Sequence, residues 1–143
     1  MPITEINENQ KRSIAGSLAL LDEVLCLFVE YAEGREVHSV CYTERNRLTQ
    51  RQREKLLAEI QRIREQMRQI EGELKLPVRV EDVAKKIWGH SAAFWEVVAE
   101  MESKRLKGYG EVSASLAAYL DPQVTELMGR LQTMSGLAGG DDD

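Results

Sequence analysis

The segment Leu56–Leu74, LLAEIQRIREQMRQIEGEL, carries the clearest structural signal in this sequence. Its apolar residues are separated alternately by four and by three positions, and they are Leu56, Ile60, Ile63, Met67, Ile70 and Leu74. A repeat of about 3.5 residues keeps apolar side chains on one side of an α-helix. The segment is therefore predicted to be a helix that packs along its length on another helix.

Residues 4–34 repeat this spacing and are predicted to form the partner helix. Their apolar row, or seam, consists of Ile14, Leu18, Leu21, Leu25, Phe28 and Ala32. Val24 and Tyr31 beside this seam are apolar too, where a two-stranded coiled coil would carry charges. The wider apolar surface indicates contact with two neighbours, as in a helical bundle. Thr4 is the expected N-cap and Gly34 the expected residue after the helix end.

The connection over residues 35–48 admits two interpretations. Val37, Cys41 and Leu48 share a face if the connection is helical, but that face is out of phase with the later seam. Thr49 and Gln52 fit a capping box, which marks a helix start. The connection is predicted either to extend the next helix through a stutter or to form a separate helical piece that meets it near Thr49. The capping box favours the second interpretation.

The second half of the chain predicts two more helices after Pro77. Residues 81–107 carry two parallel apolar seams, which require two packed faces. The first seam is Val83, Ile87, His90, Phe94, Val97 and Met101, and the second is Ala84, Trp88, Ser91, Trp95 and Val98. The last helix is predicted in two parts, residues 113–120 and 122–134, because Asp121-Pro122 fits an N-cap followed by proline in the first helical position.

The predicted fold is all-α, an antiparallel up-down four-helix bundle with long first and second helices and a split fourth helix. A length of 143 residues with 43% hydrophobic and 30% charged residues fits one folded domain. We assign residues 1–137 to this domain and residues 138–143 to a disordered acidic tail. The order of a long hairpin followed by shorter helices resembles the architecture of small bacterial export chaperones and adaptor bundles.

Catalytic, metal-binding and cofactor-binding residues are not predicted, so the chain is expected not to be an enzyme. His38 and His90 lie outside any helical metal-ligand spacing. Cys26 and Cys41 form no CxxC motif, and Cys26, within the apolar run VLCLFV, is expected to be a buried thiol. An enzyme would need a site that the sequence hides.

The predicted function is protein–protein interaction, either with a partner or with a second copy of the chain. The candidate partner-binding residues are Trp88, Trp95 and Phe94, since large aromatic side chains dominate interface energies. The opposing interpretation is that the fourth helix covers both indoles. That helix offers little apolar surface before Asp121, so at least one indole is expected to be partly exposed.

The alternative function is nucleic-acid binding by an arginine-rich helix face. The segment from Glu44 to Arg68 holds eight basic residues against four glutamates, whereas the whole chain has a net charge of −5. The candidate residues in this stretch, Arg45 to Arg68, are Arg47, Arg51, Lys55 and Arg62. Solvated charge pairs on a helix are the more ordinary explanation, and no aromatic residues are interleaved to stack on bases. Nucleic acid is therefore possible but not favoured.

A membrane partner is not expected. The N-terminus lacks an apolar segment typical of a secretory signal, and the longest apolar run covers only Val24–Val29, far below the roughly 20 residues that span a bilayer. A cytoplasmic location is the resulting expectation.

Overall fold

The computed structural model describes residue 3 and residues 5–139, and it confirms the all-α prediction. These residues form five helices: α1 (Glu8–Ala32), α2 (Gln50–Leu74), α3 (Val83–Ala99), the short α4 (Ser103–Leu106) and α5 (Ala114–Gly139). A 3₁₀ turn, η1 (Lys107–Tyr109), follows α4. The described residues contain no β-strand, only an isolated β-bridge between His38 and Thr43.

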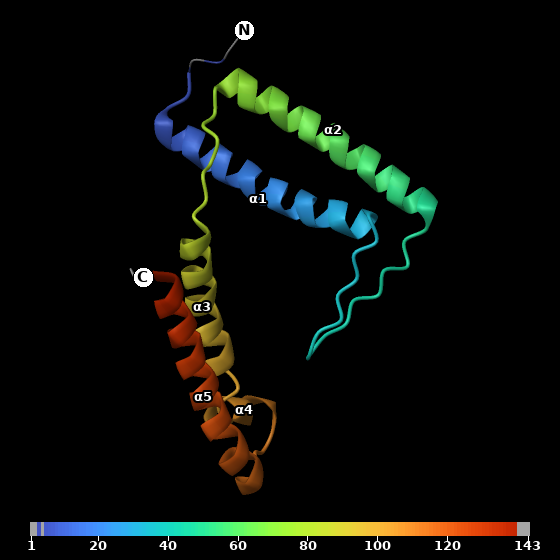
Figure 1. Cartoon of the computed structure of the whole chain (residues 1–143). Coiled ribbons are helices and arrows are strands. Elements are labelled where there is room, and N and C mark those ends of the chain that lie inside the picture. The colour runs from blue at the N-terminus through green and yellow to red at the C-terminus, as the bar shows by residue number, and fades with distance from the viewer. Residues whose placement is uncertain (1–2, 4, 140–143) are drawn as a thin grey trace. The chain divides into compact units, whose positions relative to one another are not determined.

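The chain divides into two compact units, Met1–Arg79 and Val80–Asp143, where the sequence predicts one domain over residues 1–137. Within the first unit α1 and α2 form an antiparallel hairpin, and within the second α3 and α5 do so, with α4 beside α5 (Figure 1). The long helices thus occur as two hairpins. Their arrangement in a single four-helix bundle stays a prediction.

The α1–α2 hairpin uses the predicted α2 seam and part of the predicted α1 seam, in which Leu21 and Phe28 are each 39% exposed. Leu25 and Ala32 of α1 are buried, as is Ile60 of α2, which is only 2% exposed. Leu76, just after α2, is buried as well. Apolar side chains spaced by three and four positions therefore meet along the hairpin, as expected for helices that pack lengthwise.

Both ends of α1 are closed by local hydrogen bonds. The helix begins after Asn7, which forms a capping box with Gln10, so the cap is not the predicted Thr4, which lies outside the described residues. Gly34 follows the helix end with a φ of +100°, as predicted. The amides of Gly34 and Arg35 donate to the carbonyls of Tyr31 and Glu30 at 3.0 and 2.9 Å, which is a Schellman motif.

The ends of α2 agree with the sequence prediction. Thr49 and Gln52 form the expected capping box: the amide of Gln52 donates to Thr49 Oγ1 at 3.1 Å, and the amide of Thr49 donates to Gln52 Oε1 at 2.8 Å. At the other end Lys75 adopts left-handed dihedrals, with a φ of 51°. This lets the amide of Leu76 donate to the carbonyl of Glu71 at 3.1 Å.

Neither interpretation of residues 35–48 is correct, because this connection is not helical. It forms a two-limbed arm that projects from the α1–α2 hairpin (Figure 1). The limbs are joined by backbone hydrogen bonds from Ser39 to Tyr42 at 2.9 Å and from Glu44 to Val37 at 2.8 Å. Its β-branched and aromatic residues suit an extended backbone better than a helix. We call residues 35–48 the arm.

The α3–α5 hairpin has a small core. Ser91 and Ala99 of α3 and Val124 of α5 are buried, and Val124 is fully enclosed. Asp82 caps α3 by accepting the amide of Ala84 at 3.0 Å. The helix ends at Ala99, earlier than the predicted residue 107, and the chain continues through a turn into α4. The second predicted seam of residues 81–107 is the one that packs on α5.

The predicted split at Asp121-Pro122 is wrong, because α5 is one helix that contains Pro122. Proline removes one amide donor and its ring crowds the carbonyl four residues earlier, but the helix continues on either side of it. Asp121 does not cap its own helix. Its carboxylate accepts the amide of Ser103 at 2.9 Å and the hydroxyl of Ser103 at 2.7 Å, at the start of α4. Helix α5 also includes residues 138 and 139 of the predicted tail, whereas residues 140–143 lie outside the described residues.

Candidate interaction surfaces

The three predicted partner-binding residues lie on two sides of α3. Trp95 is partly buried and lines a pocket of about 270 Å³ with Ser91 and Leu131. Trp88 is 56% exposed beside the C-terminal end of α5, so one indole is partly exposed, as expected. Phe94 is 52% exposed on the other flank of the contact with α5. The structure therefore separates Phe94 from the two tryptophans.

The first seam of α3 is exposed along its whole length. Its large apolar side chains are between 38% and 68% exposed: Val83, Ile87, Phe94 and Val97 lie on α3, and Met101 lies in the turn that follows the helix. His90, the remaining member of the seam, is exposed too. A helix with two apolar seams needs two neighbours, and α5 supplies a neighbour for one seam.

Helix α5 adds a second exposed row on the same side of the hairpin. At about 100° per residue, the α3 row lies roughly a quarter to a third of a turn from the residues that face α5. Around the axis of α5, Leu127 and Met134 are rotated by about a quarter of a turn from the buried Val124. The direction of this rotation, followed from the N- to the C-terminus of the helix, is the same as for the α3 row. Because the helices are antiparallel, equal senses of rotation bring both rows to one side. We call this surface the α3–α5 apolar face: Val83, Ile87, Phe94, Val97, Met101, Leu116, Leu127 and Met134.

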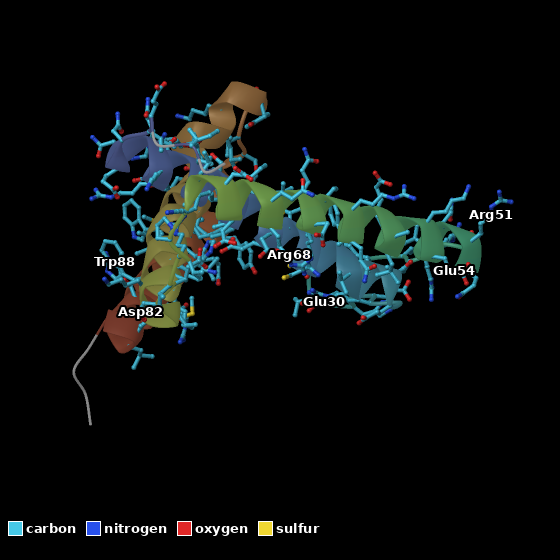
Figure 2. The ribbon with its side chains drawn as sticks, turned by 90° about the horizontal axis from the view of Figure 1, so that it is seen from above. Glu30, Arg51, Glu54, Arg68, Asp82 and Trp88 are labelled. Carbon is cyan, nitrogen blue, oxygen red and sulfur yellow. The ribbon has the colours of Figure 1, made fainter. Side chains whose placement is uncertain are left out.

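The structure brings together three of the four predicted nucleic-acid-binding residues. Arg51, Lys55 and Arg62 lie on the outer side of α2, away from α1, and Figure 2 shows Arg51 at the start of this helix. Arg62 pairs with Glu59 at 3.0 Å, whereas Arg51 and Lys55 have no ion-pair partner among the described residues. Arg47 lies in the arm. The cationic row on α2 is therefore shorter than the sequence suggests.

The arm is a surface that the sequence interpretation missed. Its base is held by two side chains. Glu44 accepts the hydroxyl of Tyr31 through one carboxylate oxygen and the amide of Val37, at 3.2 Å, through the other. The hydrogen bond to Glu44 raises the pKa of Tyr31, with burial as a further cause. The side-chain amide of Asn46 donates to the carbonyls of Tyr31 and Arg35 at 2.7 and 2.9 Å.

The tip of the arm presents apolar side chains to solvent. Val40 is 97% exposed and Tyr42 57% exposed, and Cys41 between them is exposed. Val40 to Thr43 contains β-branched and aromatic residues in a row, which is the signal that could have predicted an extended segment here. The hydrogen bonds at the base fix this tip at the end of a short, ordered connection.

A cleft of about 700 Å³ lies where the arm meets the ends of α1 and α2. Arg45 and Arg47 line it and have no ion-pair partner among the described residues, while apolar surface comes from Phe28 and Leu48. Side chains two positions apart in an extended chain point to the same side, which places both guanidinium groups together. Arg35, also in the lining, is paired with Glu30.

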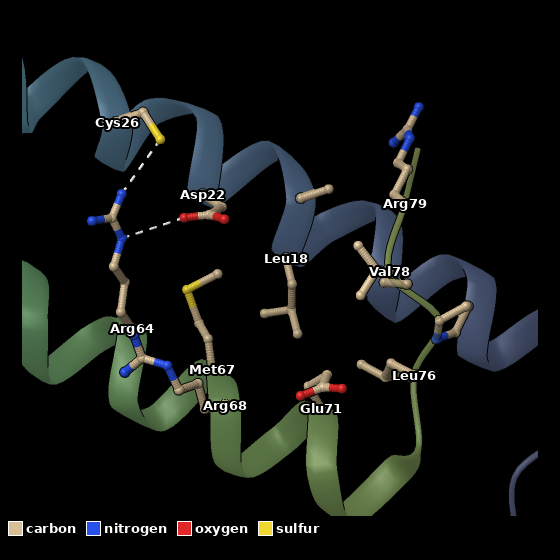
Figure 3. Close-up of a pocket in the computed structure, with 13 residues that line it drawn as sticks. Leu18, Asp22, Cys26, Arg64, Met67, Arg68, Glu71, Leu76, Val78 and Arg79 are labelled. Atoms are coloured by element: carbon tan, nitrogen blue, oxygen red, sulfur yellow. Dashed lines mark hydrogen bonds and ion pairs between the residues drawn. The ribbon is translucent and has the colours of Figure 1, made fainter. Parts of the chain in front are cut away.

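A second cleft in the first unit, of about 460 Å³, lies between α1, α2 and residues 76–79 (Figure 3). Arg64 crosses one end of it. Its Nε is 3.4 Å from a carboxylate oxygen of Asp22, and its Nη2 donates to the sulfur of Cys26 at 3.4 Å. The predicted burial of Cys26 is wrong, because this thiol lies at the edge of the cleft and is exposed.

The described residues hold no group of three histidine, cysteine, aspartate or glutamate side chains that could bind a metal ion. His38 lies 3.9 Å from Glu36, and His90 lies among the exposed residues of the α3 seam. In the part of the chain that the structure covers, every helix is too short or too polar to cross a membrane.

Comparison of the chain with protein-family models, with curated proteins and with solved structures gave no match in any of the three.

Proposed function

We propose that this chain is a non-enzymatic protein–protein interaction module, an adaptor or chaperone-like helical protein that also self-associates. The observation that supports the proposal is the α3–α5 apolar face. Eight large apolar side chains on one side of a two-helix unit are exposed, each to at least 38%. Exposed apolar surfaces of this kind in soluble proteins commonly mark interaction sites.

The composition of the face suits an interface. Phe94 stands near the middle of its row and can act as an aromatic anchor, the kind of residue that contributes most to binding. Full burial of one such side chain contributes roughly 1.5–3 kcal/mol. Lys86 and Glu100 lie along one edge of the row, which gives that edge of the apolar face a charged border.

The four-helix arrangement belongs to this proposal. A helix hairpin with one apolar face completes a four-helix core when a second hairpin packs on that face. The second hairpin can come from the same chain or from another copy. The proposal also places the protein in the cytoplasm, which fits the two unpaired cysteines, since reducing compartments keep thiols free.

The test is a substitution that places a charge in the centre of the face. The Phe94→Asp variant is expected to lose self-association in light scattering and to lose proteins captured by the wild-type chain from its native cell. Tyr109→Asp is the matched control, since Tyr109 is 92% exposed outside the face. A folded Phe94→Asp variant with unchanged mass and unchanged capture would overturn the proposal.

A second candidate function is nucleic-acid binding through α2. It is favoured by one observation, that Arg51 and Lys55 are exposed on one side of α2 without an ion-pair partner among the described residues. Filter binding of RNA and duplex DNA at two salt concentrations tests it. Binding that weakens steeply with salt and is reduced in an Arg51→Ala, Lys55→Ala variant would establish this function. Weak binding that the variant leaves unchanged would exclude it.

A further inference from the structure

The exposed row of α3 is flanked by charges of opposite sign at its two ends. Lys86 lies one turn into the helix and Glu100 at its C-cap. With about 100° per residue, both project from the same edge of the row. Each is also seven positions from Ala93, since Lys86 precedes it and Glu100 follows it by that number. The edge is therefore basic at one end and acidic at the other, with its centre at Ala93.

We propose that the α3–α5 apolar face docks on the same face of a second copy of this chain, with the two α3 helices antiparallel around a twofold axis near Ala93. This inference rests on the proposed function and names the partner. In the antiparallel pairing Lys86 of each copy lies opposite Glu100 of the other. A parallel pairing would instead set Lys86 against Lys86 and Glu100 against Glu100.

The apolar residues fit the same axis. Phe94 lies on the exposed row at nearly the same height along the helix axis as Ala93, so it packs close to its own copy at the centre of the interface. The two α5 rows, with Leu127 and Met134, close the sides. The result is a four-helix core made from two hairpins, in which both copies bury their exposed rows at once.

The charges at the rim are already held in place within one chain. Lys86 pairs with Glu81, and Glu100 accepts a hydrogen bond from Arg105 at 2.9 Å. In the sequence Glu81 and Arg105 are each twelve positions from Ala93, although Glu81 precedes α3 and Arg105 lies in α4. The acidic, basic, acidic, basic order along this segment is thus complementary to itself when the direction is reversed.

The competing cover for the face is α1 of the same chain, which exposes Leu20, Val24 and Phe28. Its charges match less well. Between residues 13 and 34 the sequence has four acidic residues and no lysine or arginine, so α1 can match Lys86 but repels Glu100. A second copy matches both charges.

The experiment reverses one charge at a time and then mixes the variants. The full-length wild-type chain is expected to form a concentration-dependent dimer in sedimentation equilibrium. Lys86→Glu and Glu100→Lys are each expected to weaken this dimer by roughly five- to tenfold, because each creates two like-charged contacts. An equimolar mixture is expected to recover wild-type affinity as a heterodimer, in which both contacts again join opposite charges.

Lys85→Glu is the matched control, because Lys85 makes the same change of charge on the side of α3 that faces away from the row. It is expected to leave the dimer unchanged. The double variant Lys86→Glu, Glu100→Lys is expected to dimerise like the wild type, which also shows that the single variants are weakened by pairing and not by misfolding. Circular dichroism checks helix content in every variant.

Two results would overturn the inference and leave at least the partner-binding part of the proposed function standing. One is a wild-type chain that stays monomeric while Phe94→Asp still loses a captured partner. The other is a dimer that the mixture of single variants does not restore, since that excludes the antiparallel pairing. If Phe94→Asp changes neither mass nor capture, the proposed function fails together with the inference.

Discussion

The two hairpins of this protein differ in how completely each helix uses its apolar surface. In α2 all six seam residues from Leu56 to Leu74 are buried or partly buried, and none of its described large apolar side chains is exposed. In α3 the second seam packs on α5, while the first seam is exposed. A helix with one seam is satisfied by one neighbour, whereas a helix with two seams stays incomplete in a hairpin. The number of apolar seams thus indicates which helices need a further neighbour: α3, and also α1, which exposes Leu20, Val24 and Phe28.

The largest expected effect on stability comes from replacing a buried isoleucine of the α1–α2 hairpin with alanine. The same replacement at an exposed isoleucine of α3 provides the comparison. Ile60→Ala should lower the free energy of unfolding by about 2–5 kcal/mol, because it opens a cavity in the α1–α2 core. Ile87→Ala should cost about 1 kcal/mol or less at concentrations where the chain is monomeric, since Ile87 is 43% exposed. Urea unfolding followed by circular dichroism measures both. Equal losses would show that the exposed seam of α3 is covered in the monomer.

A smaller and more local effect is expected in the arm. Asn46→Ala removes a side chain that donates to the carbonyls of Tyr31 and Arg35, and the lost hydrogen bonds should destabilise the arm by about 1–3 kcal/mol. Hydrogen exchange at the amides of Ser39 and Glu44 should accelerate, while exchange within α2 stays unchanged.

The control for this variant is Asn9→Ala, at an exposed position in the first turn of α1. It should leave exchange in the arm unchanged. If Asn46→Ala gives the same result as the control, the arm is held by its backbone hydrogen bonds and by Glu44 without Asn46.

A gain of stability is expected where α2 ends. Lys75 has a φ of 51°, which costs a residue with a side chain about 1 kcal/mol and costs glycine almost nothing. Lys75→Gly should therefore raise the free energy of unfolding by up to about 1 kcal/mol. Lys85→Gly, in the interior of α3, should lower it by about 0.5–1 kcal/mol. A loss in both variants would mean that the left-handed residue is not strained.

Features that depend on neighbouring residues could be predicted from the sequence. The α2 seam and the capping box of Thr49 and Gln52 follow from spacing alone. The arm could not, because a helical face can be drawn through Val37, Cys41 and Leu48 by chance. What decides the arm is contact with residues far away in the chain, such as Glu44 with Tyr31 and Asn46 with Arg35.

The sequence predicts only part of the candidate surface, because the rest depends on contacts between residues that are distant in the chain. The two seams of α3 and the aromatic residues on them are visible in the sequence, including Phe94 and Trp95. Which seam meets α5 depends on tertiary packing, and the structure selects the seam with Ser91 and Trp95. The assignment of Trp88, Trp95 and Phe94 to a partner contact stays a prediction, as does that of the arginines.

The smallest expected effect concerns Asp121. The sequence Asp121-Pro122 favours a helix start, but in the structure the carboxylate of Asp121 instead accepts hydrogen bonds from Ser103. Hydrogen bonds from the side chain and then the backbone of Ser103 lower the pKa of Asp121. A carboxylate whose pKa is lower in the folded state contributes stability above its unfolded pKa of about 3.9, and this contribution is lost as the pH falls through the folded pKa. Asp121→Asn should therefore be less stable than the wild type near pH 7, and the difference should shrink as the pH falls below about 4.

Thermal unfolding between pH 7 and pH 3 measures this difference, and Ser103→Ala provides the second variant. Removal of the hydroxyl that donates to Asp121 should reduce the pH-dependent part of the stability, since this hydrogen bond is the largest cause of the lowered pKa. Ser115→Ala, at an exposed position in the first turn of α5, should leave the pH dependence unchanged. A difference between Asp121→Asn and the wild type that is constant across this range would show that the carboxylate does not hold α4 on α5 through its charge.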